Sequence, residues 1–195
     1  GHSALLQWHA REGQSALLSA AAETGAARAA AIERADLSLR RAEGLALLPL
    51  PDLDHQLGAI ALERREDEEA LGRFTAAQRA NPQSLPILEQ LATVQLRLER
   101  SSDLCRTLAR TLALLEVRDP AAARERARLL LPRAVELVQG SPGDPAPVLL
   151  LCWIQALLGD PATARDNAAK HRQGDPDWLA LERRLRAAAP TGTER

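Results

Sequence analysis

The chain has 195 residues with 25 basic and 26 acidic side chains, and its net charge of −1 provides no overall attraction to nucleic acid or to an anionic membrane. Hydrophobic residues make up 46% of it, a globular rather than disordered composition, and no apolar run reaches the roughly 18 residues of a membrane span. Alanine, leucine, arginine and glutamate dominate, whereas strand-favouring residues are scarce, so we expect an all-α fold.

Two helices are expected within residues 1–50, but they show no repeat. The first covers residues 3–22, with Gly13 as a weak point, and the second covers residues 26–48 and ends at Pro49. The sequence contains no methionine, so we interpret Gly1-His2-Ser3 as the remnant of a removed tag and expect the native N-terminus to be missing. The cellular compartment therefore stays open.

The first helical hairpin is predicted over residues 52–83. Leu57-Gly58 lies in its first helix, and the charged stretch 63–69 predicts a solvated turn. Apolar residues recur at spacings of three and four in the second helix, as in an amphipathic helix: Ala70, Phe74 and Ala77. Asn81-Pro82 then ends this helix, because proline cannot continue it and restrains the residue before it.

The same pattern returns 34 residues later. Leu91-Ala92 takes the place of Leu57-Gly58, and Ser101-Ser102-Asp103 supplies the turn and an N-cap for the next helix. The apolar positions of that helix are Leu104, Leu108 and Thr111. Residues 51–118 are therefore predicted to hold two repeats.

An irregular helical insert and a linker are predicted over residues 119–144. The leucine of the third copy, Leu151, lies 60 residues after Leu91, which is not a multiple of 34. Asp119-Pro120 is typical of a helix start, and Pro132 is expected to break or kink the helix that follows. Residues 140–145 are rich in glycine and proline and predict the linker.

A third copy is predicted over residues 145–178, followed by a capping helix over 176–189. Gly159-Asp160-Pro161 ends the first helix of this copy and opens the second. The remaining pattern positions are Leu151, Cys152, Ala164, Ala168 and Pro176. Three arginines are expected on the outer side of the capping helix, namely Arg183, Arg184 and Arg186, and residues 190–195 are expected to fray.

Together these positions resemble the tetratricopeptide repeat (TPR) family. Its motif has a large and a small residue in the first helix, a small, a large and a small residue in the second, and a closing proline. The first copy matches it with Leu57, Gly58, Ala70, Phe74, Ala77 and Pro82. The resemblance implies an α–α superhelix in which helical hairpins cover one another's apolar faces.

The resemblance also implies a concave groove, lined by first-helix side chains, that binds a segment of a partner protein. Carried over position by position, the groove residues are Asp52, His55, Ala59, Leu62 and Glu63, then Glu89, Thr93, Leu96 and Arg97, then Leu149, Trp153, Ala156 and Leu157. These residues do not reproduce the Lys/Asn/Arg clamp with which family members hold the acidic C-terminus of heat-shock chaperones. A co-chaperone role is therefore disfavoured.

No residue is assigned to catalysis, to a cofactor or to a metal. His9, His55 and His171 stand alone without the spacing of a metal motif, and no glycine-rich phosphate loop follows a strand. Cys105 and Cys152 form no CxxC pair, so we expect buried free thiols rather than a disulfide.

Two further stretches bear on the partner. The arginine-rich segments 124–133 and 183–186 contain or adjoin glutamates, and the chain has three Trp and one Phe, which argues against nucleic acid. Residues 148–158 are apolar on nearly every side and must be covered all round. Either the chain's own helices cover them, the usual arrangement, or a partner segment or a second copy does, giving a homo-oligomer through the helix around Trp153.

The leading hypothesis is a non-enzymatic scaffold or assembly module that binds a protein segment in its groove. The residue usage is typical of a GC-rich bacterial genome. The alternative is a helical-repeat sensor domain of a larger transcription regulator, which binds a small effector. A third is an enzyme whose site no motif reveals.

Overall fold

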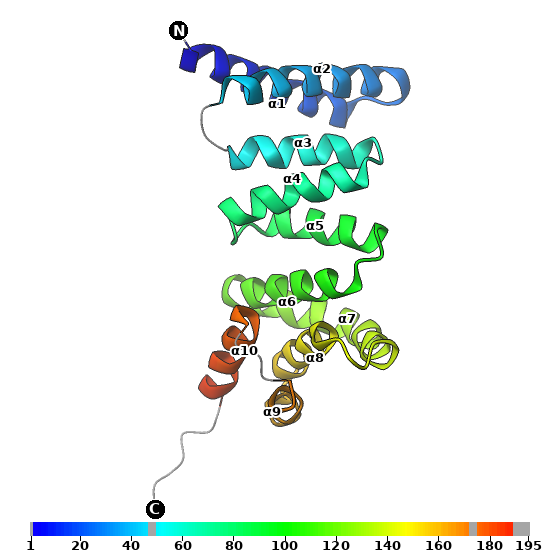
Figure 1. Ribbon diagram of the computed structural model, residues 1–195, viewed down its shortest axis with the longest axis vertical. Coiled ribbons are helices and arrows are strands. Elements are labelled where there is room, and N and C mark those ends of the chain that lie inside the picture. Colours follow the sequence, from blue (N-terminus) through cyan, green and yellow to red (C-terminus); the bar gives the residue numbers. More distant parts are fainter. Residues whose placement is uncertain (1, 47–49, 172–174, 189–195) are drawn as a thin grey trace, which may run out of the picture. The chain divides into compact units, whose positions relative to one another are not determined.

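The computed structural model describes residues 2–46, 50–171 and 175–188, in which ten α-helices and no strand form. The helices are α1 (His2–Ala22), α2 (Gly25–Leu45), α3 (Pro51–Glu63), α4 (Asp67–Ala80), α5 (Leu85–Arg97), α6 (Ser101–Arg118), α7 (Pro120–Gly140), α8 (Pro145–Leu157), α9 (Pro161–Ala169) and α10 (Pro176–Ala187) (Figure 1). The all-α prediction is confirmed. The chain divides into two compact units, unit 1 (Gly1–Leu98) and unit 2 (Glu99–Arg195).

Proline and aspartate mark most helix starts, as local chemistry requires. Proline occupies the first turn of α3, α5, α7, α8, α9 and α10, where its missing N–H would have no helical partner. At α7 the predicted cap forms, because the Asp119 carboxylate accepts hydrogen bonds from the N–H groups of Ala121 and Ala122 at 3.1 and 3.0 Å. The predicted stop of α4 is also confirmed, since the helix ends at Ala80 before Asn81.

Gly13 was predicted to be a weak point of the first helix, but in unit 1 it is a position of close helix–helix packing. It lies in α1, which forms a hairpin with α2, and a Cβ atom at position 13 would lie 2.6 Å from Leu39 Cγ and 3.3 Å from the Ala35 carbonyl oxygen. The absence of a side chain therefore lets the two helices approach each other. α2 ends at Leu45, and the predicted end around residues 47–49 lies outside the described residues.

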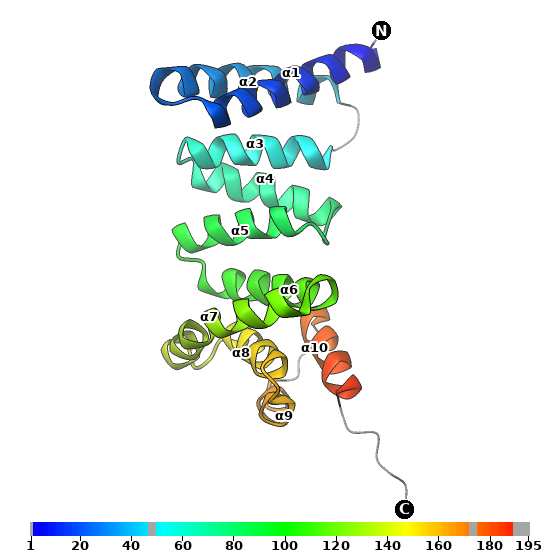
Figure 2. The ribbon, with the colours of Figure 1, turned by 180° about the vertical axis from the view of Figure 1, so that it is seen from behind.

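The α3–α4 hairpin brings together a small and a large pattern residue of the first copy. Gly58 of α3 faces Phe74 of α4, so that a Cβ atom at position 58 would lie 2.8 Å from Cε1 of the ring. Phe74, Ala70 and Ala77 are fully buried. α5 packs against α4 and α3, and its Leu91 belongs to the same core cluster as Phe74 (Figure 1 and, from behind, Figure 2).

Ion pairs link successive hairpins of unit 1. They are Arg28–Glu63 at 2.8 Å, Arg64–Glu33 at 2.9 Å, Arg73–Glu43 at 3.1 Å and Arg97–Asp67 at 3.0 Å, and they span 35, 31, 30 and 30 residues. The hydrogen bonds from Arg73 to Glu43 raise the pKa of Arg73, so its guanidinium stays charged. α2, α3, α4 and α5 are thus tied together in chain order.

Three turns between consecutive helices share one backbone geometry. Arg65, Glu99 and Gly159 have positive φ angles of 62°, 56° and 94°. The residue before each of these three donates its backbone N–H to the carbonyl oxygen four residues earlier in the chain. These hydrogen bonds run from Arg64 to Ile60, from Leu98 to Val94 and from Leu158 to Ile154. The turns are 34 and 60 residues apart, the same offsets that separate the three predicted copies.

The predicted N-cap of α6 is wrong. Ser101 is already the first residue of α6, and Arg100 occupies the cap position without a side-chain cap hydrogen bond. The left-handed backbone of Glu99 reverses the chain directly into the helix, and the hydroxyl of Ser102 instead donates a hydrogen bond to Asp144. The unit boundary falls between α5 and α6, so the pairing of these two helices into the second repeat stays a prediction.

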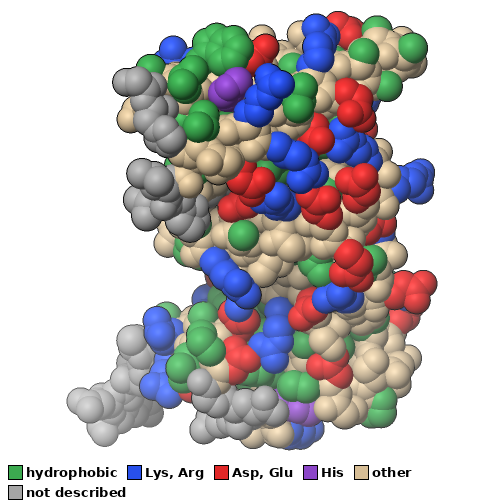
Figure 3. Space-filling model, turned by 45° about the horizontal axis from the view of Figure 1, so that its top comes forward, with side chains coloured by type: hydrophobic (Ala, Val, Ile, Leu, Met, Phe, Trp, Pro, Cys, Tyr) green, Lys and Arg blue, Asp and Glu red, His purple; other side chains and the backbone are tan. Residues whose placement is uncertain are grey.

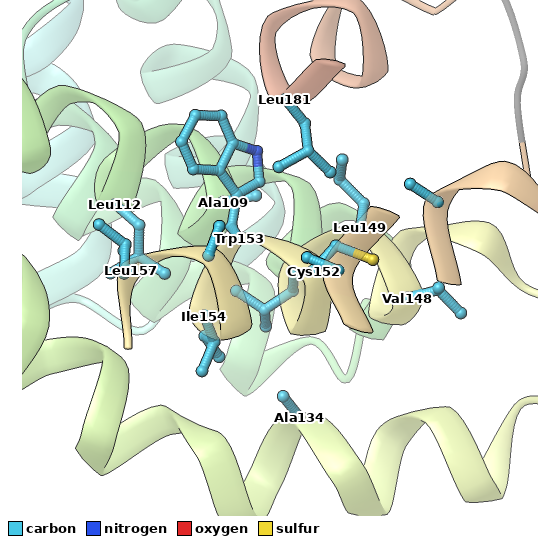
Figure 4. Close-up of a cluster of buried hydrophobic side chains, with 14 of the residues drawn as sticks. Ala109, Leu112, Ala134, Val148, Leu149, Cys152, Trp153, Ile154, Leu157 and Leu181 are labelled. Carbon is cyan, nitrogen blue, oxygen red and sulfur yellow. The ribbon is translucent and has the colours of Figure 1, made fainter. Parts of the chain in front are cut away.

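α8 forms the centre of unit 2, where α6, α7 and α9 pack against it and α10 contacts it as well. Its Leu149 and Ile154 have no exposed surface, and Ala164 and Ala168 of α9 are buried in the same core cluster. Figure 4 shows how side chains from several helices surround α8. α8 and α9, the two helices of the third predicted copy, therefore pack against each other.

Most of the segment 119–144, predicted as an irregular helical insert and a linker, forms one helix, and a turn over residues 141–144 follows it. α7 runs unbroken and buries Ala123, Ala127 and Ala134, and it packs against α6 and α8. Pro132 lies inside α7 on its exposed side. The carbonyl that loses its helical partner there belongs to the equally exposed Arg128, where water can replace the lost hydrogen bond.

α10 corresponds to the predicted capping helix, with one arginine placed differently. Arg183 and Arg186 are exposed as predicted. Arg184 instead turns inward, where its Nε lies 2.6 Å from the Glu116 carboxylate and its Nη2 donates to the Ala156 carbonyl at 3.4 Å. Gly1 and the tail predicted at 190–195 lie outside the described residues.

Candidate interaction surface

The predicted groove residues of α3 are partly exposed, but they do not all point the same way. His55, Ala59 and Leu62 are half-buried along the helix. Glu63 is exposed, and its carboxylate is paired with Arg28 of α2 at 2.8 Å. Glu63 therefore belongs to the packing between α2 and α3 rather than to a free groove.

The predicted groove residues of α5 form one exposed stripe. Glu89, Thr93 and Leu96 follow one another at spacings of four and three, and all three are exposed. The Thr93 hydroxyl donates a hydrogen bond to the Glu89 carbonyl at 2.9 Å. Leu96 is 59% exposed, whereas Leu88 and Leu91 of the same helix are buried. The stripe thus combines an apolar side chain with polar groups on the side of α5 away from the core.

Arg97 brings the α3 and α5 sets together. Its Nη1 donates to the Leu62 carbonyl at 3.4 Å, and its Nη2 lies 3.0 Å from the Asp67 carboxylate. Because 35 residues separate positions 62 and 97, this contact joins equivalent ends of two helices one repeat apart. We call the resulting surface the α3–α5 face, consisting of His55, Ala59, Leu62, Glu89, Thr93, Leu96 and Arg97.

A hollow of about 540 Å³ between α1 and α3 adjoins this face. Its polar lining comes from Arg11 and Gln14 of α1 and from Asp52, His55 and Gln56 of α3. Sequence reasoning missed the two α1 residues, because α1 and α2 are 21 residues long each and do not follow the 34-residue pattern. The hollow offers a cation, a carboxylate and two amides to a bound segment.

The third predicted set, from α8, is core, and its assignment to the groove is wrong. Leu149, Trp153, Ala156 and Leu157 are all buried, with Trp153 only 5% exposed. Figure 4 shows the Trp153 ring beside Leu181 of α10. An apolar helix is covered here by its own unit, so Trp153 offers no surface for the predicted homo-oligomer.

The two cysteines are free and buried, as predicted. Burial raises the pKa of Cys105 to about 12, with a contribution from Asp144, and burial likewise raises the pKa of Cys152 to about 12. Both thiols therefore stay protonated near neutral pH, and a protonated thiol is a poor nucleophile. Within the described ranges, no three His, Cys, Asp or Glu side chains gather as metal ligands.

Charges of both signs alternate on one face of the molecule. On the face seen in Figure 3, acidic and basic side chains are interspersed rather than gathered by sign. On this face, the pattern gives no continuous basic stripe for a nucleic acid backbone. Among the described helices, none has both the length and the apolar character needed to cross a bilayer.

No protein-family model matches the chain, and neither does any curated protein or solved structure. The assignment of a function therefore rests on the geometry of the α3–α5 face and the hollow beside it.

Proposed function

We propose that the chain is a non-enzymatic helical-repeat scaffold, similar to TPR proteins, that binds a segment of a partner protein across the α3–α5 face. Support for a repeat comes from the three equivalent turns at Arg65, Glu99 and Gly159 and from the contact of Gly58 with Phe74. In a stack of hairpins, the side chains of successive first helices share one surface. The contact of Arg97 with the Leu62 carbonyl fits this arrangement.

The exposed stripe of α5 is the observation that carries the proposal. Leu96 is 59% exposed, and Thr93 and Arg97 of the same helix are exposed as well. Surfaces that bind proteins combine apolar contact with a limited number of hydrogen-bonding groups. An extended segment with an apolar side chain for Leu96 and Leu62, and with polar groups for the adjoining hollow, fits this face.

Selection of peptides from a displayed library on the whole chain tests the proposal, followed by dissociation constants from fluorescence polarisation. Leu96→Asp should weaken the selected peptides at least about tenfold, because a buried apolar contact becomes an unpaired charge. Leu37→Asp is the matched control, since Leu37 of α2 is 55% exposed and lies outside the α3–α5 face. Its dissociation constants should equal those of the unmodified chain.

Equal weakening by both variants, or a library from which no peptide is enriched, would overturn the proposal. A small molecule that raises the melting temperature while no peptide binds would favour the sensor function instead, because a ligand that binds only the folded state stabilises it.

A further inference from the structure

A second hollow lies within unit 2, and its described lining contains three arginines and no acidic residue. It has a volume of about 470 Å³ and is open to solvent on one side. Arg124 and Arg128 of α7, Arg184 of α10 and residues 156–159 at the end of α8 border it. The hollow beside α3 differs, because Asp52 belongs to its lining. Side chains of one sign therefore surround a single space in unit 2.

Two of these arginines, on α7, can turn their guanidinium groups to a ligand. Arg124 and Arg128 are spaced i and i+4, so they lie on the same side of the helix, and both are exposed. Within the described part of the chain, Arg124 has no hydrogen bond or ion pair. Arg128 pairs with Glu125 at 3.2 Å, but the two side chains are 64% and 65% exposed. Such a pair is weak, and a bound anion can replace Glu125.

The third arginine, Arg184, is held in place by its neighbours. Its Nε lies 2.6 Å from the Glu116 carboxylate, and its Nη2 donates to the Ala156 carbonyl at 3.4 Å. Neither contact uses Nη1, which stays a donor for a ligand. Because two contacts fix the guanidinium, less side-chain freedom is lost when an anion binds to it.

The end of α8 would repel an anion if its carbonyl groups had no donors, because the C-terminus of a helix carries partial negative charge. The carbonyls of Ile154, Gln155 and Ala156 at this end each accept a hydrogen bond. The carboxylate of Asp160, which follows directly in the chain, accepts a hydrogen bond from the Thr163 N–H at 3.1 Å and so caps α9. The negative groups closest in the chain therefore have donors of their own.

The donors and the size of the hollow favour a phosphate monoester. A phosphate monoester has three terminal oxygens and a charge between about −1.5 and −2 at pH 7, so it can accept from all three guanidinium groups. A carboxylate has two oxygens and one charge. The volume of about 470 Å³ is typical of small-molecule sites, which range from about 300 to 1,000 Å³. Leu158 in the lining is 36% exposed and offers apolar contact to the rest of such a molecule.

We propose that this hollow binds a phosphate monoester with an apolar substituent, either a small molecule or a phosphorylated side chain of another protein. The phosphate group lies among Arg124, Arg128 and Arg184, and the substituent lies against Leu158. The site belongs to unit 2, whereas the α3–α5 face belongs to unit 1, so its existence does not depend on the function proposed for that face.

Titration of the whole chain with phenyl phosphate tests this site by nuclear magnetic resonance of the arginine Nε–H groups. The signal that disappears in Arg124→Gln identifies Arg124, and this signal should shift as phenyl phosphate is added. Arg124→Gln should weaken binding about tenfold, as expected for the loss of a charged hydrogen bond. Arg183→Gln is the matched control, because Arg183 is an exposed arginine of α10 outside the hollow and the change in net charge is the same. Its dissociation constant should equal that of the unmodified chain.

Benzoate and inorganic phosphate separate the two parts of the ligand. Phenyl phosphate should bind at least about tenfold tighter than benzoate, which has one charge and two acceptor oxygens. Leu158→Ala should weaken the binding of phenyl phosphate but not that of inorganic phosphate, because only the first has an apolar group to lose contact. A peptide with phosphotyrosine that binds tighter than phenyl phosphate would assign the site to a phosphorylated protein, and equal or weaker binding would assign it to a small molecule.

Three results would overturn the proposal. Equal weakening by Arg124→Gln and Arg183→Gln would mean that net charge alone attracts the anion. Equal dissociation constants for benzoate and phenyl phosphate would contradict the phosphate assignment. An Arg124 signal that stays unchanged with every probe would show that the hollow binds no anion.

Discussion

The replacement of Gly58 by alanine probes the α3–α4 hairpin at its tightest point. The new Cβ atom would lie 2.8 Å from Cε1 and 2.9 Å from Cδ1 of Phe74, whereas ordinary contacts begin at 3.4 Å. The ring or the helix must therefore move by about 0.6 Å, the difference between 3.4 and 2.8 Å. Phe74 has no exposed surface, so its ring has no solvent-filled space to enter.

Two effects of opposite sign decide the magnitude. Alanine is favoured over glycine inside a helix by about 0.8–1 kcal/mol, whereas overpacking a core costs about 1–3 kcal/mol. Gly58→Ala should therefore lower the free energy of unfolding by about 0–2 kcal/mol. Gly72 of α4 is the matched control, because no atom beyond its chain neighbours and the adjoining backbone of its own helix lies within 4 Å of its Cβ position. Gly72→Ala should raise the free energy of unfolding by up to about 1 kcal/mol.

Urea unfolding followed by circular dichroism measures both effects. In a Phe74→Leu background, where the ring is absent, Gly58→Ala should become stabilising, so the double-mutant cycle should give a coupling energy of about 1–3 kcal/mol. If Gly58→Ala and Gly72→Ala stabilise the unmodified chain equally, Gly58 does not lie against Phe74 and the described packing is incorrect.

Three other changes have expected outcomes. Trp153→Ala should lower the free energy of unfolding by about 3–5 kcal/mol in urea titrations, because it empties a core site; a loss below about 1 kcal/mol would place Trp153 on the surface. Cys105 and Cys152 should react with a thiol reagent at pH 7 only after denaturant is added, and rapid reaction in the native state would contradict their burial. In the folded chain the pKa of each thiol is raised above the ordinary 9.0, so burial of the two protonated thiols contributes its full stabilisation below pH 9.0. This contribution should be lost as the pH rises toward about 12, and urea midpoints measured across this pH range can show the loss. Asp119→Ala should cost about 1 kcal/mol through the lost cap of α7 and should lower the thermal midpoint; an unchanged midpoint would mean that the cap contributes nothing.

The sequence predicted the parts of the fold that depend on local chemistry. The scarcity of strand-forming residues predicted an all-α chain, and Asp119-Pro120 and Asn81-Pro82 predicted a helix start and a helix end. The sequence also placed Gly58 and Phe74 in the two helices of one hairpin, and the structure brings them into contact. These features depend on a few neighbouring residues and little on the rest of the molecule.

Features set by packing between distant segments could not be predicted in this way. Gly13 lowers helix propensity in isolation, but its contact with Leu39 makes it a packing position. Proline ends helices in general, yet α7 continues through Pro132, where both Pro132 and Arg128 are exposed and water can replace the lost hydrogen bond.

The candidate site was predicted in part. Thr93 and Leu96 of α5 were assigned from the TPR resemblance, position by position, and the structure shows that both are exposed. Trp153 was misplaced because the sequence of α8 shows that the helix must be covered but not which helix covers it. Arg11 and Gln14 were missed, because only the structure shows that α1 borders the hollow beside α3.

The contact between Gly58 and Phe74 can be measured most directly by nuclear Overhauser effects. Phe74 is the one phenylalanine of the chain, so its ring protons can be assigned without ambiguity. Stacked helical hairpins predict strong cross-peaks between these ring protons and the Hα protons of Gly58. A ring that shows cross-peaks to other residues but none to Gly58 would contradict the hairpin on which the repeat architecture and the proposed binding face depend.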